Sequence, residues 1–147
     1  MYFNIEAGAV HIENAYFYNV GQRWDWLTFE FGPNVGRSDN FISGCAFKEN
    51  FHGVVNVENQ RVSAGITFTH NVLFDYYFEL IILEGVGGHV ITHNTAISAQ
   101  SKGMNDKIAE PEDASVWSRY TRTPNTINHN YLSGIYNFQF SPHILTI

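Results

Sequence analysis

Short alternations of apolar and polar residues recur along the chain in one repeated form. Three segments are closely similar: Ile66–Phe74, Val90–Ile97 and Thr126–Leu132. Two looser copies lie upstream, at Val10–Phe17 and Phe41–Phe47. The shared pattern is an apolar residue, any residue, a polar residue or glycine, a small residue or asparagine, any residue, and a second apolar residue. Alternation over so few residues predicts short, half-buried β-strands.

The copies align on the small or asparagine position. This position is occupied by Ala15, Cys45, Asn71, Asn94 and Asn130, with separations of 30, 26, 23 and 36 residues. A second alternating run follows four of the copies, at Leu27–Phe31, Val54–Val57, Leu80–Leu83 and Tyr136–Phe140. The fourth copy leads instead into the polar stretch 101–123, for which we expect a loop or a short helix that projects from the fold.

Strands that recur every 23 to 36 residues, with no helical period between them, predict an all-β solenoid. We expect a single-stranded, right-handed parallel β-helix in which each inward residue stacks on its equivalent about 4.8 Å away. Its five coils would span residues 9–39, 40–63, 64–87, 88–123 and 124–147. Asparagine would occupy the corners because it tolerates the left-handed conformation and because its amide bonds to neighbouring coils. The alternative is a β-sandwich, which is also built from short, evenly spaced strands.

Composition favours strands and excludes several functions. The 147 residues fit one domain, with 16% aromatic and only 15% charged residues. The net charge of -6 disfavours nucleic acid and anionic membranes as partners, since both require a basic surface. No apolar run reaches the roughly 18 residues of a membrane helix, so we expect no embedded segment. The single cysteine, Cys45, excludes a disulfide within one chain and is expected to be a buried, inert thiol.

Several motifs, in their order along the chain, resemble the parallel β-helix region of the fibrocystin and fibrocystin-like family, which related cell-surface and secreted hyaluronidases share. They are Phe17–Gln22, Asn40–Phe47, His70–Asp75, Ile82–Gly85 and Gly88–Asn94, and the resemblance covers about residues 9–100. Where the family carries a His-x-His pair, this chain has Thr28 and Glu30. The resemblance therefore implies the non-enzymatic branch, an extracellular location or one at the cell or ciliary surface, and no cofactor.

Histidine immediately precedes three of the aligned asparagines, at His70, His93 and His129. In the predicted register these rings stack on successive coils beside a ladder of Asn71, Asn94 and Asn130. Three imidazoles at coil spacing could share a metal ion. Rings stacked in parallel about 4.8 Å apart direct their nitrogens side by side, not toward one tetrahedral centre. We therefore expect a structural ladder facing solvent, and no metal site.

Acidic and aromatic residues are candidates for ligand chemistry. Polysaccharide-cleaving β-helices use carboxylates on an exposed sheet face as general acid and base or as Ca²⁺ ligands. If this chain is an enzyme, its candidates are Glu30, Glu84 and Asp75, although no pair has a diagnostic spacing. A ligand-binding face would comprise Trp24, Trp26, Glu30, Asn56 and Glu84. The two tryptophans, with Tyr16 and Tyr18, form an aromatic cluster whose rings could stack on the flat faces of sugars. The alternative is that the carboxylates only solvate the outer face and that Trp26 packs inward.

We therefore expect a non-catalytic structural or adhesive module of a large surface protein. Its partners would be coils, domains or subunits stacked end-on, or a glycan. Neither end of the sequence resembles a solenoid cap, so we expect a fragment of a longer chain or a subunit that stacks on a partner. Two rival interpretations are a polysaccharide-binding or polysaccharide-degrading enzyme of the hyaluronidase or lyase type, and a trimeric viral tail spike.

Overall fold

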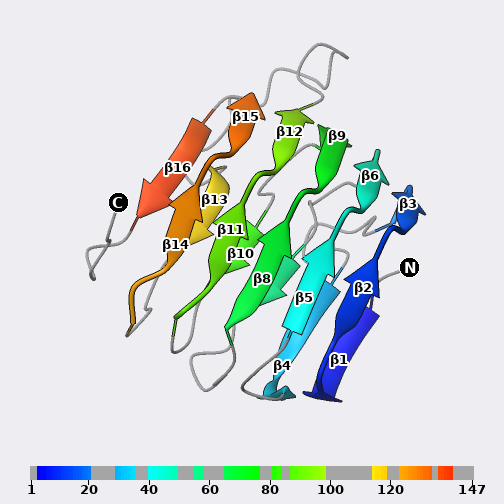
Figure 1. Ribbon diagram of the computed structural model, residues 1–147, viewed down its shortest axis with the longest axis vertical. Helices are drawn as coiled ribbons and strands as arrows, with labels where there is room; N and C mark the ends of the chain where they lie inside the picture. The colour runs from blue at the N-terminus through cyan, green and yellow to red at the C-terminus, as the bar shows by residue number, and fades with distance from the viewer. Residues whose placement is uncertain are drawn as a thin grey trace.

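The computed structural model describes residues 3–20, 29–35, 40–49, 55–57, 65–76, 81–83, 87–98, 114–118, 123–133 and 136–140. Every regular element in these ranges is a β-strand, and none is a helix. The strands form three sheets in which neighbouring strands are parallel (Figure 1). The predicted all-β class is therefore confirmed. The parallel pairing contradicts the antiparallel layers of a β-sandwich for the described part of the chain.

Each sheet is built from strands that are far apart in the sequence. Sheet A has the order β1 (Phe3–Gly8), β4 (Phe29–Val35), β7 (Val55–Val57), β10 (Ile81–Leu83), β13 (Ala114–Ser118) and β16 (Tyr136–Phe140). Sheet B contains β2 (His11–Glu13), β5 (Asn40–Ser43), β8 (Ile66–Thr69), β11 (Val90–Thr92) and β14 (Thr126–Asn128). Sheet C contains β3 (Tyr16–Tyr18), β6 (Ala46–Lys48), β9 (Val72–Tyr76), β12 (Thr95–Ser98) and β15 (Tyr131–Ser133).

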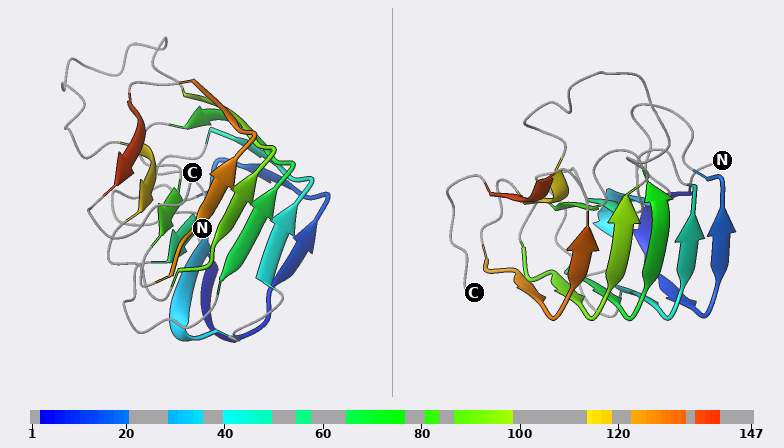
Figure 2. Two further views of the ribbon diagram at one scale, coloured as in Figure 1. Left: turned by 60° about the vertical axis from the view of Figure 1, so that its left-hand side comes forward. Right: turned by 90° about the horizontal axis from the view of Figure 1, so that it is seen from above.

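The chain passes through the three sheets in the same order each time. After β1 it makes five circuits, a circuit being one passage through sheet B, then sheet C, then sheet A. Both views in Figure 2 show successive circuits bending from sheet B into sheet C along one aligned corner. This cyclic order places equivalent residues of successive circuits beside one another, in columns that run across the strands.

The five aligned positions of the repeat lie side by side at the corner between sheets B and C. Backbone hydrogen bonds connect neighbouring circuits there, each from the residue after an aligned position to the aligned carbonyl of the previous circuit. These bonds run from Ala46 to Ala15 (2.9 Å), from Val72 to Cys45 (2.9 Å), from Thr95 to Asn71 (2.9 Å) and from Tyr131 to Asn94 (2.8 Å). The repeat therefore identified a real structural register.

Two columns of apolar side chains form the core. The inward column of sheet B consists of Ile12, Ile42, Phe68, Ile91 and Ile127, and that of sheet C of Phe17, Phe47, Leu73, Ala96 and Leu132. From sheet A, Phe29 packs edge-to-face on Phe17, with the ring centroids 5.2 Å apart. Parallel strands in register bring equivalent side chains within about 5 Å, so branched and aromatic residues stack into continuous columns.

Two strands lie where the sequence did not predict them. Strand β13 lies inside the stretch 101–123, for which a loop or short helix was expected, and it pairs with β10 and β16. Strand β1 precedes the first predicted coil and pairs with β4. The expectation for 101–123 was wrong at residues 114–118 because an Ala-Ser-Val-Trp-Ser run alternates only weakly. Val116 and Trp117 are residue types enriched in strands, but the partners that complete the sheet, β10 and β16, are distant in the sequence.

Replacing Phe68 by alanine tests the core column. Phe68 is fully buried, between Ile42 and Ile91 of the neighbouring strands. Removing its ring should lower the free energy of unfolding by about 3–5 kcal/mol, as measured by chemical denaturation. The matched control is Phe74→Ala, because the Phe74 side chain is 41% exposed and its loss should cost about 1 kcal/mol or less. Equal losses in the two variants would contradict the assignment of Phe68 to the interior.

Candidate functional site

Each circuit turns from sheet B into sheet C through one residue in the left-handed backbone conformation. The φ angles are 53° at Asn14, 63° at Gly44, 56° at His70, 57° at His93 and 54° at His129. Glycine, asparagine and histidine are enriched in this conformation. The left-handed residue therefore comes one position before the aligned asparagine. The expectation that the aligned asparagines themselves occupy left-handed corners was wrong.

The aligned asparagines bond to the circuit before their own. Asn94 Oδ1 accepts the backbone N–H of Asn71 at 2.9 Å, and Asn94 Nδ2 donates to the carbonyl of Phe68 at 2.9 Å. Asn71 makes the same two bonds: its Oδ1 accepts the N–H of Cys45 at 2.9 Å and its Nδ2 donates to the Ile42 carbonyl at 3.0 Å. Asn130 repeats them, accepting the N–H of Asn94 at 3.0 Å and donating to the Ile91 carbonyl at 2.7 Å. The amides also bond to one another, from Asn71 to Asn94 at 3.1 Å and from Asn94 to Asn130 at 3.0 Å. The asparagine ladder thus satisfies polar backbone groups that the corner would otherwise bury unpaired.

A second polar column lies where the chain enters sheet B. Asn40, His89 and Asn125 are only 2%, 0% and 3% exposed. Asn40 Oδ1 accepts the N–H of Val10 at 2.9 Å, and Asn125 Oδ1 accepts that of His89 at 3.1 Å. His89 Nδ1 accepts the N–H of Ile66 at 3.2 Å, so the proton of a neutral His89 ring is on Nε2. Each side chain again bonds to the circuit before its own.

The repeat, as aligned on Ala15, Cys45 and the three asparagines, does not reveal this second column. Asn40, His89 and Asn125 each stand five positions before an aligned residue. A repeat examined over that longer unit would have shown a polar residue entering sheet B in three of five copies. Its identity changes between asparagine and histidine, and Val10 and Ile66 occupy it in the remaining copies, so a search for one residue type does not detect it.

The three corner histidines stack ring on ring. The centroids of His70 and His93 are 4.9 Å apart and those of His93 and His129 are 5.0 Å apart, with the rings within 2° and 4° of parallel. Thr69 Oγ1 lies 2.8 Å from Nδ1 of His70, and all three histidines are exposed. Among the described residues, no group of three or more histidine, cysteine, aspartate or glutamate residues is arranged to hold a metal ion.

The outer face of sheet C carries most of the large hydrophobic side chains that are exposed among the described residues. Of the six large hydrophobic residues that are exposed in the described ranges, five belong to this face: Tyr16 (63%), Tyr18 (55%), Phe74 (41%), Ile97 (39%) and Tyr131 (63%). They come from two outward columns, one running from Tyr16 to Tyr131 and the other from Tyr18 through Phe74 to Ile97. Exposed apolar side chains that gather on one face of a folded protein are typical of a binding surface.

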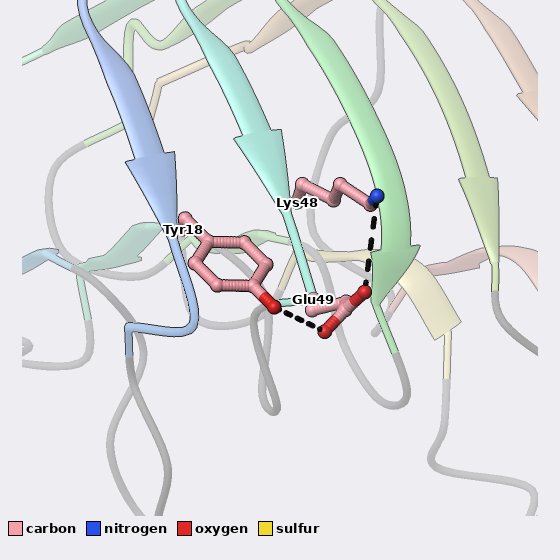
Figure 3. A network of polar contacts seen from close by, with 3 residues as sticks. All are labelled: Tyr18, Lys48 and Glu49. Carbon is pink, nitrogen blue, oxygen red and sulfur yellow. Dashed lines mark hydrogen bonds and ion pairs between the residues drawn. The ribbon is translucent and has the colours of Figure 1, made fainter.

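A small polar network borders this face. The Tyr18 hydroxyl donates to Glu49 Oε2 at 3.1 Å, and Lys48 Nζ lies 3.9 Å from Glu49 Oε1 (Figure 3). Tyr18 and Lys48 occupy paired positions on β3 and β6. The Lys48–Glu49 ion pair is 45% and 32% exposed, so it contributes little to stability. The hydroxyl bond does fix the direction of the Tyr18 ring on the sheet surface.

Glu49 adopts the left-handed conformation, with a φ angle of 56°. Its backbone N–H bonds to the Phe74 carbonyl at 3.0 Å, and Asn19, with a φ angle of 55°, makes the equivalent bond to Lys48. Glutamate in this conformation costs roughly 1 kcal/mol relative to glycine, whereas asparagine offsets part of that cost through local hydrogen bonds. Glu49 is therefore a less favourable corner residue than Asn19.

Cys45 occupies the asparagine position of its circuit. Its sulfur lies 3.9 Å from the carbonyl oxygen of Ile12 and 3.3 Å from that of Ser43. Burial raises the pKa of the Cys45 thiol above its ordinary value, and the nearby backbone of Ala15 opposes the shift in part. The thiol is thus protonated at neutral pH, and it makes in weaker form the bonds that an asparagine amide makes in the later circuits.

The ligand candidates from the sequence are only partly brought together. Glu30 and Asn56 are directly paired on β4 and β7 of sheet A, but their side chains fall outside the described part of the structure. Asp75 is the unpaired residue of an irregularity in β9, between Phe74 and Tyr76. Trp24, Trp26, Thr28 and Glu84 lie outside the described residues. Tyr16 and Tyr18, the tyrosines of the predicted aromatic cluster, are exposed on the outer face of sheet C. The sequence did not indicate the other exposed residues of that face, which are Phe74, Ile97 and Tyr131.

No protein-family model, curated protein or solved structure matches this chain. Within the part of the chain that the structure describes, no helix is long and apolar enough to cross a membrane. Any function must therefore be argued from the ladders and from the exposed faces of the sheets.

Asn94→Ala tests the asparagine ladder. The substitution removes the acceptor of the Asn71 N–H and the donor to the Phe68 carbonyl, both of which are buried. The free energy of unfolding should fall by about 2–4 kcal/mol, since each buried polar group left unpaired costs about 1–3 kcal/mol. Asn128→Ala is the control, because Asn128 is exposed and its loss should change stability by about 0.5 kcal/mol or less. Comparable losses at both positions would rule out a special role for the ladder.

Cys45→Asn should extend the ladder by one circuit. An amide at this position can accept from Ala15 and donate to the Ile12 carbonyl, which the Cys45 sulfur approaches only at 3.9 Å. We expect the free energy of unfolding to rise by about 1 kcal/mol, the net value of a typical hydrogen bond. Cys45→Ala, which supplies no polar group, should be less stable than the wild type. The prediction fails if thermal denaturation places the asparagine variant at or below the wild type.

Proposed function

We propose that the stacked sheets form a right-handed parallel β-helix that acts as a non-catalytic structural or adhesive module. The observation that carries the proposal is the asparagine ladder, in which each amide bonds to the backbone of the preceding circuit. Stability in such a stack comes from contacts between neighbouring repeats. A molecule held together in this way suits a structural role or the display of a binding surface. Its interior keeps the same contacts from circuit to circuit, while the residues of its outer faces can change without disturbing them.

The module belongs, in this proposal, to a large extracellular or ciliary surface protein of the fibrocystin-like kind. Sheets A, B and C end at β1, β2 and β3 on one side and at β16, β14 and β15 on the other. Each of these strands pairs on one side only among the described residues. Strand edges are templates for further pairing, so the natural partners are coils, domains or subunits stacked end-on.

The described side chains support a non-catalytic role. The neighbouring titratable side chains in the described ranges are the histidine stack and the exposed network of Tyr18, Glu49 and Lys48. Parallel imidazoles present ring faces to one another, and the Lys48–Glu49 pair is open to solvent. Neither arrangement has a general acid and a general base facing each other across a substrate-sized space, as polysaccharide cleavage requires.

Hydrogen exchange tests the ladder on which the proposal rests. Asn71 and Asn94 are buried, and their N–H groups donate to the side-chain oxygens of Asn94 and Asn130, so these N–H groups should be among the slowest to exchange. In Asn94→Ala the exchange at Asn71 should accelerate more than at Glu49, whose N–H bonds to the Phe74 carbonyl. Exchange at Asn71 that accelerates no more than exchange at Glu49 would overturn the stacked module.

Activity assays test the non-catalytic role separately. The chain should release no reducing ends or unsaturated products from hyaluronan, pectate or alginate, with and without Ca²⁺. Turnover that disappears in Glu30→Gln would establish the rival, a polysaccharide-degrading β-helix, and would place its site on sheet A.

A further inference from the structure

Two tyrosines form an exposed platform at one end of sheet C. Tyr16 and Tyr18 are the first and third residues of β3, on the outward side of the strand, and are 63% and 55% exposed. Residues two apart on a strand lie about 6.6 Å from each other on the same face. On the adjacent strand β6, Tyr16 pairs with the small residue Ala46, which leaves one side of its ring uncrowded.

The platform has a polar border with both donors and acceptors. Tyr18 donates its hydroxyl proton to Glu49, and Lys48 lies beside the other carboxylate oxygen. A carboxylate can accept about four hydrogen bonds and an ammonium group can donate three, so both retain capacity for a ligand. Apolar ring faces next to such groups match a sugar, which combines flat C–H faces with equatorial hydroxyls.

The backbone of Glu49 gives independent support for a use beyond folding. Glu49 is left-handed at φ 56°, at a corner where the neighbouring circuit has Asn19. Folding alone favours asparagine or glycine there. Residues kept in a costly conformation concentrate at binding sites, where the side chain repays the strain. The carboxylate of Glu49, through Tyr18, is the feature that asparagine would not provide.

Resting on the adhesive function proposed above, we infer that Tyr16, Tyr18 and Glu49 form a binding site for an uncharged glycan on sheet C. The charge of this face and of the whole chain favours an uncharged ligand over an anionic one. The two charged side chains described on this face, Lys48 and Glu49, form an ion pair, so their charges cancel. The whole chain carries a net charge of -6. An anionic polysaccharide, or a second copy of this chain, would meet a repulsive field. An uncharged polyhydroxylated chain would not.

Binding of neutral hexasaccharides tests the site. Cellohexaose, chitohexaose and maltohexaose are titrated into the full chain by calorimetry, with a hyaluronan hexasaccharide as the charged comparator. At least one neutral sugar should bind, and the Tyr16→Ala/Tyr18→Ala double variant should bind it about tenfold more weakly or worse, since each ring contributes a stacking interaction. His11→Ala, which removes an exposed ring from sheet B, should bind as the wild type does.

Glu49→Asn separates binding from folding. The substitution relieves the left-handed strain, so its melting temperature should equal or exceed that of the wild type. It also replaces the carboxylate that accepts from the Tyr18 hydroxyl by a shorter, uncharged amide, so its affinity for the same hexasaccharide should fall several-fold, as should that of Tyr18→Phe. If Glu49 had only a structural role, Glu49→Asn would not combine an equal or higher melting temperature with a lower affinity for the sugar.

Several results would overturn the site. They are binding of none of the neutral sugars, binding of hyaluronan alone, neutral binding unchanged in the tyrosine double variant, or a dimer in ultracentrifugation that this variant disperses. Each of these leaves the hydrogen-exchange result for Asn71 untouched. Failure of the glycan site is thus distinguishable from failure of the stacked module.

Discussion

The fold depends on how the corner between sheets B and C satisfies its buried backbone groups. A chain that bends sharply there exposes N–H and C=O groups to an interior without water. The asparagine of the following circuit supplies both an acceptor and a donor, at 2.9 Å each for Asn94. Because one planar amide does both, the geometry repeats without change from circuit to circuit. The same corner admits a left-handed residue just before the amide, so the positions are constrained as a pair.

The ladder also sets the register of everything else. Once Asn71, Asn94 and Asn130 are aligned, period-two alternation sends the neighbouring residues of sheets B and C alternately inward and outward. The inward columns become continuous stacks of isoleucine, phenylalanine and leucine. The column that contains His89 anchors the other end of the sheet B strands by the same device, with an imidazole nitrogen in place of an amide oxygen. Polar groups at both ends thus hold the register on which the apolar columns depend.

The outer faces are not bound by these constraints, and they differ. Sheet B presents mostly small polar residues and the histidine stack, whereas sheet C presents tyrosine, phenylalanine and isoleucine. This difference has no role in the hydrogen bonding of the interior. The outer faces are therefore the part of the molecule whose residues can be specific for a partner. On sheet C, the left-handed Glu49 bonded to Tyr18 is the feature that folding alone explains least.

By itself, the sequence determined the strand class, the aligned positions Ala15 to Asn130 and the stacking of the histidines, because these follow from a local pattern that recurs. It indicated Tyr16 and Tyr18 as candidate stacking residues, but it did not reveal β13, the buried column of Asn40, His89 and Asn125, or that Phe74, Ile97 and Tyr131 share a face with those tyrosines. Those features depend on which residues become neighbours across 23 to 36 residues of chain, and only the tertiary structure decides that. A weakly alternating segment becomes a strand when two parallel partners flank it, and a tyrosine becomes part of a surface only when the next circuit is laid beside it.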